Sequence, residues 1–196
     1  MIGYLFGPIQ YHDERTLTIR VGGVGWRVHC GARAIEILSK KKGDVELYTH
    51  LYVREDMQEL YGFGSREELR FFELLLSVSG VGPRSAQLIL DTLGLDIAAG
   101  AVRAKKADVF KRVPGIGTKI AQRIIIDLEP RLLRDGFAGA MELGSFEDYD
   151  DALEALRSLG YTSKEAREAL EAVSEGEASL SQRVEEALRL LGRSRT

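Results

Sequence analysis

Short runs of alternating apolar and polar residues make up the first third of the chain. Residues 1 to 64 contain five of them: MIGYLFG, TLTIRVG, GWRVHC, DVELYTHLYV and MQELYGF. Such alternation is typical of strands that bury one face, and turn residues such as the GGVG at 22 to 25 separate the runs. We predict a small antiparallel barrel or sandwich, with a short helix at 32 to 38 that covers one end of it.

The pattern changes to a helical period at Ser65. Ser65 followed three residues later by Glu68 is a capping-box pattern, which marks the start of a helix. Apolar residues then recur at helical spacing, at Leu69, Phe72, Leu75 and Leu76. We expect further helices as far as about residue 134.

Residues 136 to 147 read GFAGAMELGSFE and show no period, which predicts a flexible linker. Three short amphipathic patterns follow, with glycines at two expected helix ends and two further capping-box pairs. These are Gly160 and Gly192, and Thr162 with Glu165 and Ser179 with Gln182. The sequence thus predicts a barrel at 1–64, a helical domain at 65–135, the linker at 136–147 and a three-helix domain at 148–196.

Composition narrows the class of protein. Hydrophobic residues make up 44% of the 196, which is enough for several small cores. Cys30 is the only cysteine, so we expect a buried thiol and no disulfide within the chain, as in a reducing cytoplasm. The first ten residues lack the basic start of a signal peptide, and no apolar run approaches the length of about 18 residues that a membrane span needs.

The net charge of −3 hides an uneven distribution. Lys and Arg against Asp and Glu number 8 to 8 in residues 1–64, 12 to 9 in residues 65–135 and 7 to 13 in residues 136–196. The increments of 0, +3 and −6 add to −3. The basic surplus therefore lies in the middle segment and the acidic surplus in the last.

That middle segment contains an internal repeat with an offset of 35 residues. SGVGPRSAQLIL begins at residue 79 and PGIGTKIAQRII at residue 114, and five of the twelve aligned positions are identical. In each copy a helix is expected to run into a Gly-Val-Gly or Gly-Ile-Gly turn, and a basic residue follows two positions later, Arg84 or Lys119. This is the helix-hairpin-helix pattern.

The pattern is suited to binding phosphate. Glycine permits a positive φ and the close approach of a ligand, and the helix that follows presents unpaired N–H groups at the positive end of its dipole. The apolar residue between the glycines, Val81 or Ile116, is expected to pack between the two helices. One such turn is often only a tight turn, but two in register, each with a basic residue, favour clamps for the two backbones of a duplex.

Other candidate groups are better explained by structure. His12, His29 and His50 lack metal-ligand spacing, and the lysines at 40 to 42 are expected in a solvated turn. No P-loop, no Gly-x-Ser-x-Gly motif and no cluster of carboxylates beside a base occurs in the sequence. We therefore predict a protein that is not an enzyme and that uses no metal or cofactor.

The order of these motifs closely resembles the RuvA family of bacterial Holliday junction recognition subunits. The motifs are MIGYLFG, VGGVGWRV, THLYVREDMQELYGF, the hairpins SGVGPRSA and PGIGTKIA, and LRSLGY near the C-terminus. The resemblance implies a multidomain α+β protein with an OB-fold barrel, a tandem helix-hairpin-helix domain and a UBA-like three-helix domain. It further implies a cytoplasmic homotetramer that holds a four-way junction open and square-planar in recombination, DNA repair and the SOS response to DNA damage.

Partners are implied as well. The C-terminal domain would bind RuvB, the hexameric ATPase that drives branch migration, and the RuvC resolvase is a further candidate on the same junction. The resemblance leaves open whether one tetramer or two face-to-face tetramers hold the DNA. The lack of a P-loop agrees with it, because ATP hydrolysis would belong to the motor.

Position by position, the resemblance assigns DNA contacts to both hairpins. They are Gly80, Val81, Gly82 and Arg84 in the first, and Gly115, Ile116, Gly117, Thr118, Lys119 and Arg123 in the second. Thr118 departs from the family, which commonly has a basic residue there, and its hydroxyl is expected to cap the helix or to donate a neutral hydrogen bond. Contacts with the motor are expected among Leu156, Leu159, Tyr161, Leu188 and Leu191, each of which is also a candidate for the domain's own core.

An acidic pair lies within the segment LYVREDMQELYGF at 51 to 63. The simplest interpretation of Glu55 and Asp56 is a solvated hairpin tip. In a fourfold assembly, however, four copies would meet where the strands of a junction cross, and this acidic pin would repel a duplex that ran straight across. Arg54 beside it is expected either to contact a phosphate or to hold the two acids in place.

Two other functions stay open from the sequence. A structure-specific nuclease could use the same hairpins, but it needs converging carboxylates for Mg²⁺. Glu55 and Asp56, as neighbours on an extended segment, would point to opposite faces unless a turn intervenes. An adaptor whose main site is the C-terminal domain is the other alternative.

Overall fold

The computed structural model describes residues 2–134, 152–153, 155–162, 165–166, 169–170, 173 and 180–193. The chain divides into two compact units, Met1–Ala140 and Met141–Thr196, and each is described by itself. The predicted linker at 136–147 and Ser179 of the last predicted capping box lie outside the described residues.

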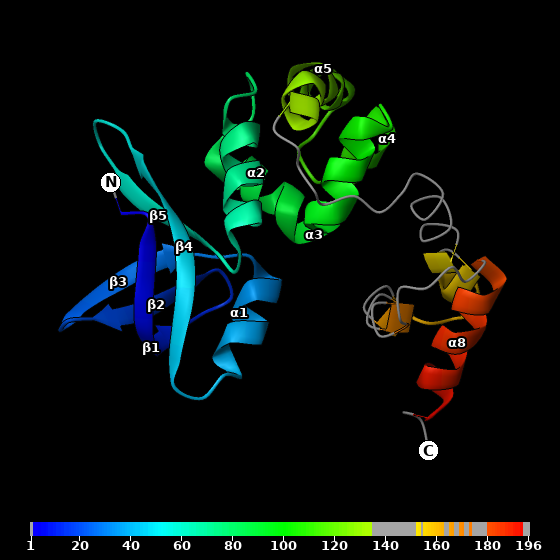
Figure 1. Ribbon diagram of the computed structural model, residues 1–196, viewed down its shortest axis with the longest axis horizontal. Helices are drawn as coiled ribbons and strands as arrows, with labels where there is room; N and C mark the ends of the chain where they lie inside the picture. Colours follow the sequence, from blue (N-terminus) through cyan, green and yellow to red (C-terminus); the bar gives the residue numbers. More distant parts are fainter. Residues whose placement is uncertain are drawn as a thin grey trace. The chain divides into compact units, whose positions relative to one another are not determined.

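A closed five-stranded barrel forms the first part of unit 1, as predicted (Figure 1). Its strands are β1 (Tyr4–His12), β2 (Thr16–Val21), β3 (Val24–His29), β4 (Asp44–Val53) and β5 (Gln58–Phe63), in the order β1-β2-β3-β5-β4. Neighbours are antiparallel except β3 and β5, which pair only at Val28 with Leu60 and His29 with Tyr61. Beside Glu59 the two strands border an open hollow in the barrel surface.

Alternate strand residues fill the barrel with apolar side chains. They include Leu5, Leu17, Ile19, Val28, Val45, Leu47 and Leu60. Helix α1 (Ala32–Ser39) contributes Ile35 and Leu38 to the same core, so it covers one end of the barrel, as predicted. Cys30 is buried in this core too, and burial raises the pKa of its thiol to about 12.

Strand β1 is longer than the sequence pattern indicates, because it continues past Pro8 to His12. Pro8 is the last residue of β1 that pairs with β4, and pairing with β2 begins at Ile9. A proline is tolerated at this change of partner because fewer ladder hydrogen bonds need its missing N–H. At Gly7 a Cβ would lie 2.1 Å from the carbonyl oxygen of Arg20, so only glycine lets the two backbones approach this closely.

Four helices follow in the described part of unit 1: α2 (Arg66–Leu76), α3 (Pro83–Arg103), α4 (Ala107–Phe110) and α5 (Thr118–Arg134). Ser65 caps α2 as predicted, while the Glu68 side chain reaches back one residue further than in a capping box. Ser65 Oγ accepts from the Glu68 N–H at 3.1 Å, and Glu68 Oε2 accepts from the Gly64 N–H at 3.1 Å. The core face of α2 is made by Phe71, Phe72 and Leu75. Leu69 and Leu76 are only partly buried.

Helix α3 is two helical stretches joined at Gly94, which has φ 75° and ψ 167°. Among the described residues, α3 alone has the length and apolar composition of a membrane span. Its break at Gly94 and its buried Ala86, Ile89 and Leu93 are the features of a core helix.

The barrel and the helices of unit 1 share a packed boundary (Figure 1). Phe72 of α2 stacks on Tyr61 of β5, with ring centroids 5.4 Å apart, and contacts the tilted ring of Phe63 at a centroid distance of 4.7 Å. On the other side, Asp91 Oδ1 of α3 accepts from the Arg33 N–H at 3.3 Å and thereby caps α1. The β4–β5 hairpin is thus anchored at its base to α2, the helix that leads into the first repeat.

Unit 2 is helical and has its own core, which includes Ala152, Leu156, Ala166, Ala169, Leu170, Val173, Ala187 and Leu191. Thr162 and Glu165 form the predicted capping box, with N–H to oxygen distances of 2.8 and 3.3 Å. Gly160 has φ 92°, which suits the predicted helix end. Gly192 is one residue before the last described residue of α8 (Leu180–Arg193), and it lacks the left-handed conformation of Gly160.

Candidate nucleic-acid interface

The first hairpin connects α2 to α3 by a tight turn. Val78 N–H donates to the Leu75 carbonyl at 3.0 Å, and Val81 N–H donates to the Val78 carbonyl at 3.0 Å. Gly80 between them has φ 92°, which an L-residue with a side chain rarely adopts. The first bond of α3 then runs from the Ala86 N–H to the Gly82 carbonyl at 2.9 Å.

The second hairpin repeats this turn 35 residues later, between α4 and α5. Val113 N–H donates to the Phe110 carbonyl at 3.1 Å and Ile116 N–H to the Val113 carbonyl at 3.0 Å. Gly115 has φ 85°, and the Ala121 N–H donates to the Gly117 carbonyl at 3.0 Å. The sequence repeat is therefore a structural repeat, bond for bond.

The apolar residue between each pair of glycines is buried, as expected. Val81 is 6% exposed and Ile116 is 5% exposed. Each side chain holds its turn against the protein, so that the backbone on either side of it faces solvent. Gly80, Gly82, Gly115 and Gly117 lie on this open side, and all except Gly82, which is partly buried, are exposed.

The two glycines of each turn have different reasons to be there. Gly80 and Gly115 are required by their positive φ. Gly82 has an ordinary φ of −94°, and a Cβ placed on either Gly82 or Gly117 would meet nothing within 4 Å. Nothing inside the described chain demands glycine at these two positions. A ligand that approaches the backbone closely would demand it.

The two hairpins lie side by side. A Cβ on Gly80 would be 3.8 Å from Ile120 of the second hairpin, and Arg123 Nη1 donates to the Ser79 carbonyl at 3.4 Å. Arg131 of α5 also donates to the Ser77 hydroxyl. The N-terminal ends of α3 and α5, each with free N–H groups and a positive dipole, are therefore neighbours.

Two basic side chains stand at these helix starts. Lys119 is exposed and makes no hydrogen bond or ion pair with a described residue. Arg84 is 83% exposed, and its Nη2 lies 3.7 Å from Glu59 Oε1 of the barrel. Thr118 does not cap α5 as we expected, because it is already the first residue of the helix, and the carbonyl of Gly117 accepts the first helical bond.

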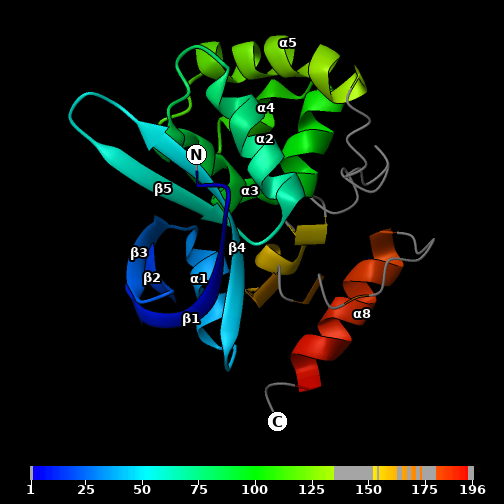
Figure 2. The same cartoon turned by 60° about the vertical axis from the view of Figure 1, so that its left-hand side comes forward.

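The acidic pair lies at the tip of the β4–β5 hairpin, which projects beyond the barrel in both views (Figures 1 and 2). Arg54 N–H donates to the Met57 carbonyl at 2.9 Å and closes the turn, and Glu55 and Asp56 between them are exposed. A turn does intervene here, so the alternation of strand residues does not separate the two carboxylates. Among the described residues, no three of His, Cys, Asp or Glu gather as metal ligands.

Arg54 holds neither acid. Its Nε donates to the Tyr52 hydroxyl at 2.6 Å, and its guanidinium lies 5.3 Å from the centre of the Tyr52 ring. No ion pair joins it to Glu55 or Asp56 within residues 2–134, so the expectation that it fixes the acids is wrong. The role of a phosphate contact stays a prediction.

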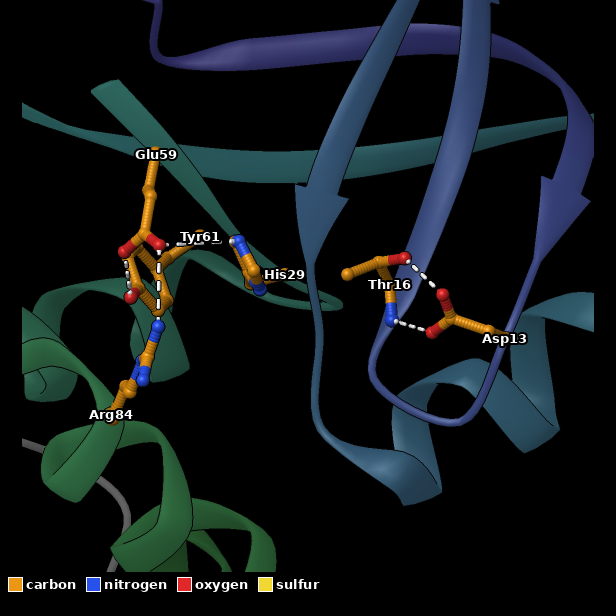
Figure 3. A network of polar contacts seen from close by, with 6 residues as sticks. All are labelled: Asp13, Thr16, His29, Glu59, Tyr61 and Arg84. Carbon is orange, nitrogen blue, oxygen red and sulfur yellow. Dashed lines mark hydrogen bonds and ion pairs between the residues drawn. The ribbon is translucent and has the colours of Figure 1, made fainter. Parts of the chain in front are cut away.

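Sequence reasoning missed a polar network at the base of this hairpin (Figure 3). Glu59 Oε2 accepts from the Tyr61 hydroxyl at 2.6 Å, and Oε1 lies 3.7 Å from both His29 Nε2 and Arg84 Nη2. Burial and, after it, the hydrogen bond to Glu59 raise the pKa of Tyr61. The spacing of Glu59 and Tyr61 on β5 places them on one face, but no sequence signal connects either of them to Arg84.

The candidate motor contacts divide into buried and exposed residues. Leu156 and Leu191 belong to the core of unit 2, at 0% and 9% exposure, whereas Leu159 is 60% exposed. Tyr161 and Leu188 are partly buried and pack against that core.

A closed five-stranded barrel joined to two adjacent helix-hairpin-helix turns defines a DNA-binding protein of the helix-hairpin-helix class. Family models agree along the chain: residues 1–62 match the RuvA N terminal domain, residues 72–129 the SAM-like helix-hairpin-helix tandem, and residues 147–192 the RuvA C-terminal domain. The chain belongs to the RuvA family.

Curated relatives match over nearly their whole length. The Holliday junction branch migration complex subunit RuvA of Ruminiclostridium cellulolyticum is 35% identical over 199 residues, which cover 97% of this chain and all of the relative. The subunit of the same name from Acetivibrio thermocellus is 36% identical over 201 residues, covering 98% and 100%. That of Dehalococcoides mccartyi is 34% identical over 189 residues, covering 96% and 97%.

Proposed function

We propose that this protein is the DNA-binding, non-catalytic subunit of a Holliday junction branch migration complex. The observation that carries the proposal is the hairpin repeat: two adjacent turns with the same hydrogen bonds, each with a glycine that only an outside ligand would require. The printed names of the relatives, which are subunits of such a complex, support it.

The hairpins would bind DNA through its phosphates. Each offers backbone N–H groups at a helix start, with Arg84 or Lys119 as an added charge and Arg123 one turn further along α5. Two adjacent clamps suit the two backbones of one duplex across a groove, and they read no base edges. Binding by these contacts alone would depend strongly on salt and little on sequence.

The acidic pin would supply the preference for a junction. A carboxylate and a phosphate 6 Å apart repel by about 0.7 kcal/mol in bulk water and by about 3 kcal/mol at an effective dielectric constant of about 20. Four pins around a fourfold axis would oppose a continuous duplex at the centre, where strands that separate can avoid them. We therefore propose a homotetramer that holds the junction open and square-planar, with one or two tetramers on the DNA.

Unit 2 is proposed as the site for the RuvB motor. Leu159 is its best candidate contact, because the side chain is 60% exposed and lies one residue before the helix-ending Gly160. Tyr161 and Leu188 are the next candidates, while Leu156 and Leu191 are engaged in the core. In this account ATP hydrolysis belongs to the motor, RuvC acts on the same junction, and the complex works in cytoplasmic recombination and repair.

One assay distinguishes a non-catalytic DNA-binding subunit from a nuclease. A labelled four-way junction is incubated with the full-length protein and Mg²⁺, without any other protein. We expect a retarded, intact junction, whereas strand cleavage would contradict the proposal.

A chain that ends at Ala140 should still bind DNA, and loss of binding would favour an adaptor whose main site is unit 2. Light scattering on the free protein should give the mass of a tetramer.

A further inference from the structure

Glu59 connects the acidic hairpin to the first phosphate-binding turn. It lies on β5 three residues after Asp56, and its Oε1 is 3.7 Å from Nη2 of Arg84 at the start of α3. Together with an interaction between Arg84 and the Tyr61 hydroxyl, this ion pair joins the pin hairpin to a residue of the proposed DNA interface. Figure 3 shows Arg84 reaching from its helix toward the barrel to make it.

The side chains of Glu59 and Arg84 differ in how far they are free to move. The Glu59 side chain is only 14% exposed, and the short 2.6 Å bond from the Tyr61 hydroxyl fixes the direction of its carboxylate. Arg84 is 83% exposed, so its long side chain would otherwise sample many directions. The carboxylate is therefore the fixed point, and it restrains where the guanidinium points.

We propose that Glu59 is a specificity-determining, positioning residue: it holds Arg84 toward the acidic hairpin, so that the arginine is used on phosphates beside the crossing point of a junction. A guanidinium has five N–H donors, and a single nitrogen faces Glu59, so the others can still bind phosphate. A straight duplex is kept away from this place by the pin. The phosphates of a straight duplex would reach the Arg84 guanidinium only if Glu59 released the arginine side chain.

This inference rests on the proposed function. It differs from the simpler view that Glu59 is a third repelling acid of the pin. In that view Glu59 acts on DNA directly, and its effect does not depend on Arg84. In our proposal, Glu59 changes the preference for a junction by orienting Arg84. Replacing Glu59 therefore has no effect on that preference once Arg84 has been replaced.

A double-mutant cycle distinguishes the two views. Affinities for a fluorescent four-way junction and for a linear duplex with the same arm sequence are measured for the full-length protein and for Glu59→Gln, Arg84→Gln and the double variant. Glutamine keeps an acceptor for the Tyr61 hydroxyl. We expect Glu59→Gln to leave junction affinity within about twofold and to tighten duplex binding about three- to tenfold, as a local change of charge can.

In the Arg84→Gln background, Glu59→Gln should change the junction-to-duplex ratio by less than about twofold. An equal change in both backgrounds would show direct repulsion and overturn the inference, as would an unchanged ratio in the wild-type background. If the wild-type protein itself shows no preference for the junction, the proposed function fails. The coupling of Glu59 to Arg84 is then judged from duplex affinity alone.

Glu46→Gln is the matched control. Glu46 is an exposed carboxylate of the same barrel that accepts from the Tyr4 hydroxyl at 3.1 Å, and no described arginine pairs with it. Its loss should leave both affinities within about twofold, and an effect as large as that of Glu59→Gln would mean that net charge alone is responsible. If Glu59→Gln proves unstable, Tyr61→Phe removes the hydroxyl that fixes the Glu59 carboxylate and that also interacts with Arg84. This variant should lower the ratio in the same direction, and an unchanged ratio would again overturn the inference.

Discussion

Arg123 of the second hairpin donates a hydrogen bond to the backbone carbonyl of Ser79 in the first, at 3.4 Å. The side chain therefore lies across the line where the two turns meet, while Lys119, one helical turn earlier, is exposed without a described partner. Arg123 therefore supports the packing of the two hairpins, whereas Lys119 contributes only charge.

Lys119→Gln tests the contribution of charge. It should weaken junction and duplex binding by a similar factor and lower the slope of log affinity against log salt concentration by about 1, because one phosphate contact is lost. Thermal unfolding should not change. Arg123→Gln should lower the slope as well and also reduce the melting temperature, since it removes the bond to Ser79. Equal melting temperatures for the two variants would contradict a supporting role for Arg123.

Gly82→Ala and Gly117→Ala test whether the open glycines serve a ligand. A Cβ at either position meets nothing within 4 Å, so both variants should fold with unchanged or slightly higher stability. Junction affinity should nevertheless fall about tenfold or more, because the methyl group occupies the space of the phosphate.

The matched controls are Gly80→Ala and Gly115→Ala. Their positive φ should cost about 1 kcal/mol of stability at each position whether or not DNA is present. Normal junction binding by Gly82→Ala would contradict the clamp. Affinity is measured by fluorescence anisotropy and stability by thermal unfolding.

Leu159→Ser and Leu156→Ala distinguish a motor contact from a core residue in unit 2. Leu159 is 60% exposed, so its replacement should leave unfolding of unit 2 unchanged and weaken association with the RuvB motor. Leu156 is fully buried, and its truncation should destabilise unit 2 by about 2 to 5 kcal/mol. Unchanged motor binding by Leu159→Ser, measured in a pull-down or by ATPase stimulation, would remove Leu159 from the contact surface.

Cys30 should be unreactive in the folded protein. Burial raises the pKa of its thiol to about 12, so only about one molecule in ten thousand carries a thiolate at pH 8. A thiol reagent at that pH should label the chain only after denaturant is added. Labelling should increase at higher pH, because the thiolate fraction rises as pH approaches the pKa. Rapid labelling of the native protein at pH 8 would contradict the burial of Cys30.

Much of this fold follows from local pattern. The strands of the barrel, the helix over its end and the helix cap at Ser65 each depend on residues close in sequence, and each was predictable for that reason. The hairpin repeat was predictable because both copies carry the same glycines at the same offset. The predicted first strand ended before Pro8, because a proline ends most strands. Here Pro8 is tolerated because the strand changes its pairing partner at this point.

The parts that the sequence did not predict depend on distant residues. Glu59 and Arg84 are 25 positions apart, and Asp91 caps α1 from 58 positions away, so neither contact leaves a local pattern. On α2, Phe71 rather than the predicted Leu69 faces the protein core, because the helix must bury a face against both the barrel and α3.

We propose that basic clamps on the arms supply affinity for DNA and that the acidic tip supplies the preference for a junction. The most direct test is the affinity of the Glu55→Gln, Asp56→Asn double variant for a four-way junction and for a linear duplex with the same arm sequence, compared with the wild-type protein. We predict equal or tighter binding to both DNAs, with a smaller preference for the junction. Much weaker junction binding with an unchanged preference would show that Glu55 and Asp56 do not discriminate between the two DNAs.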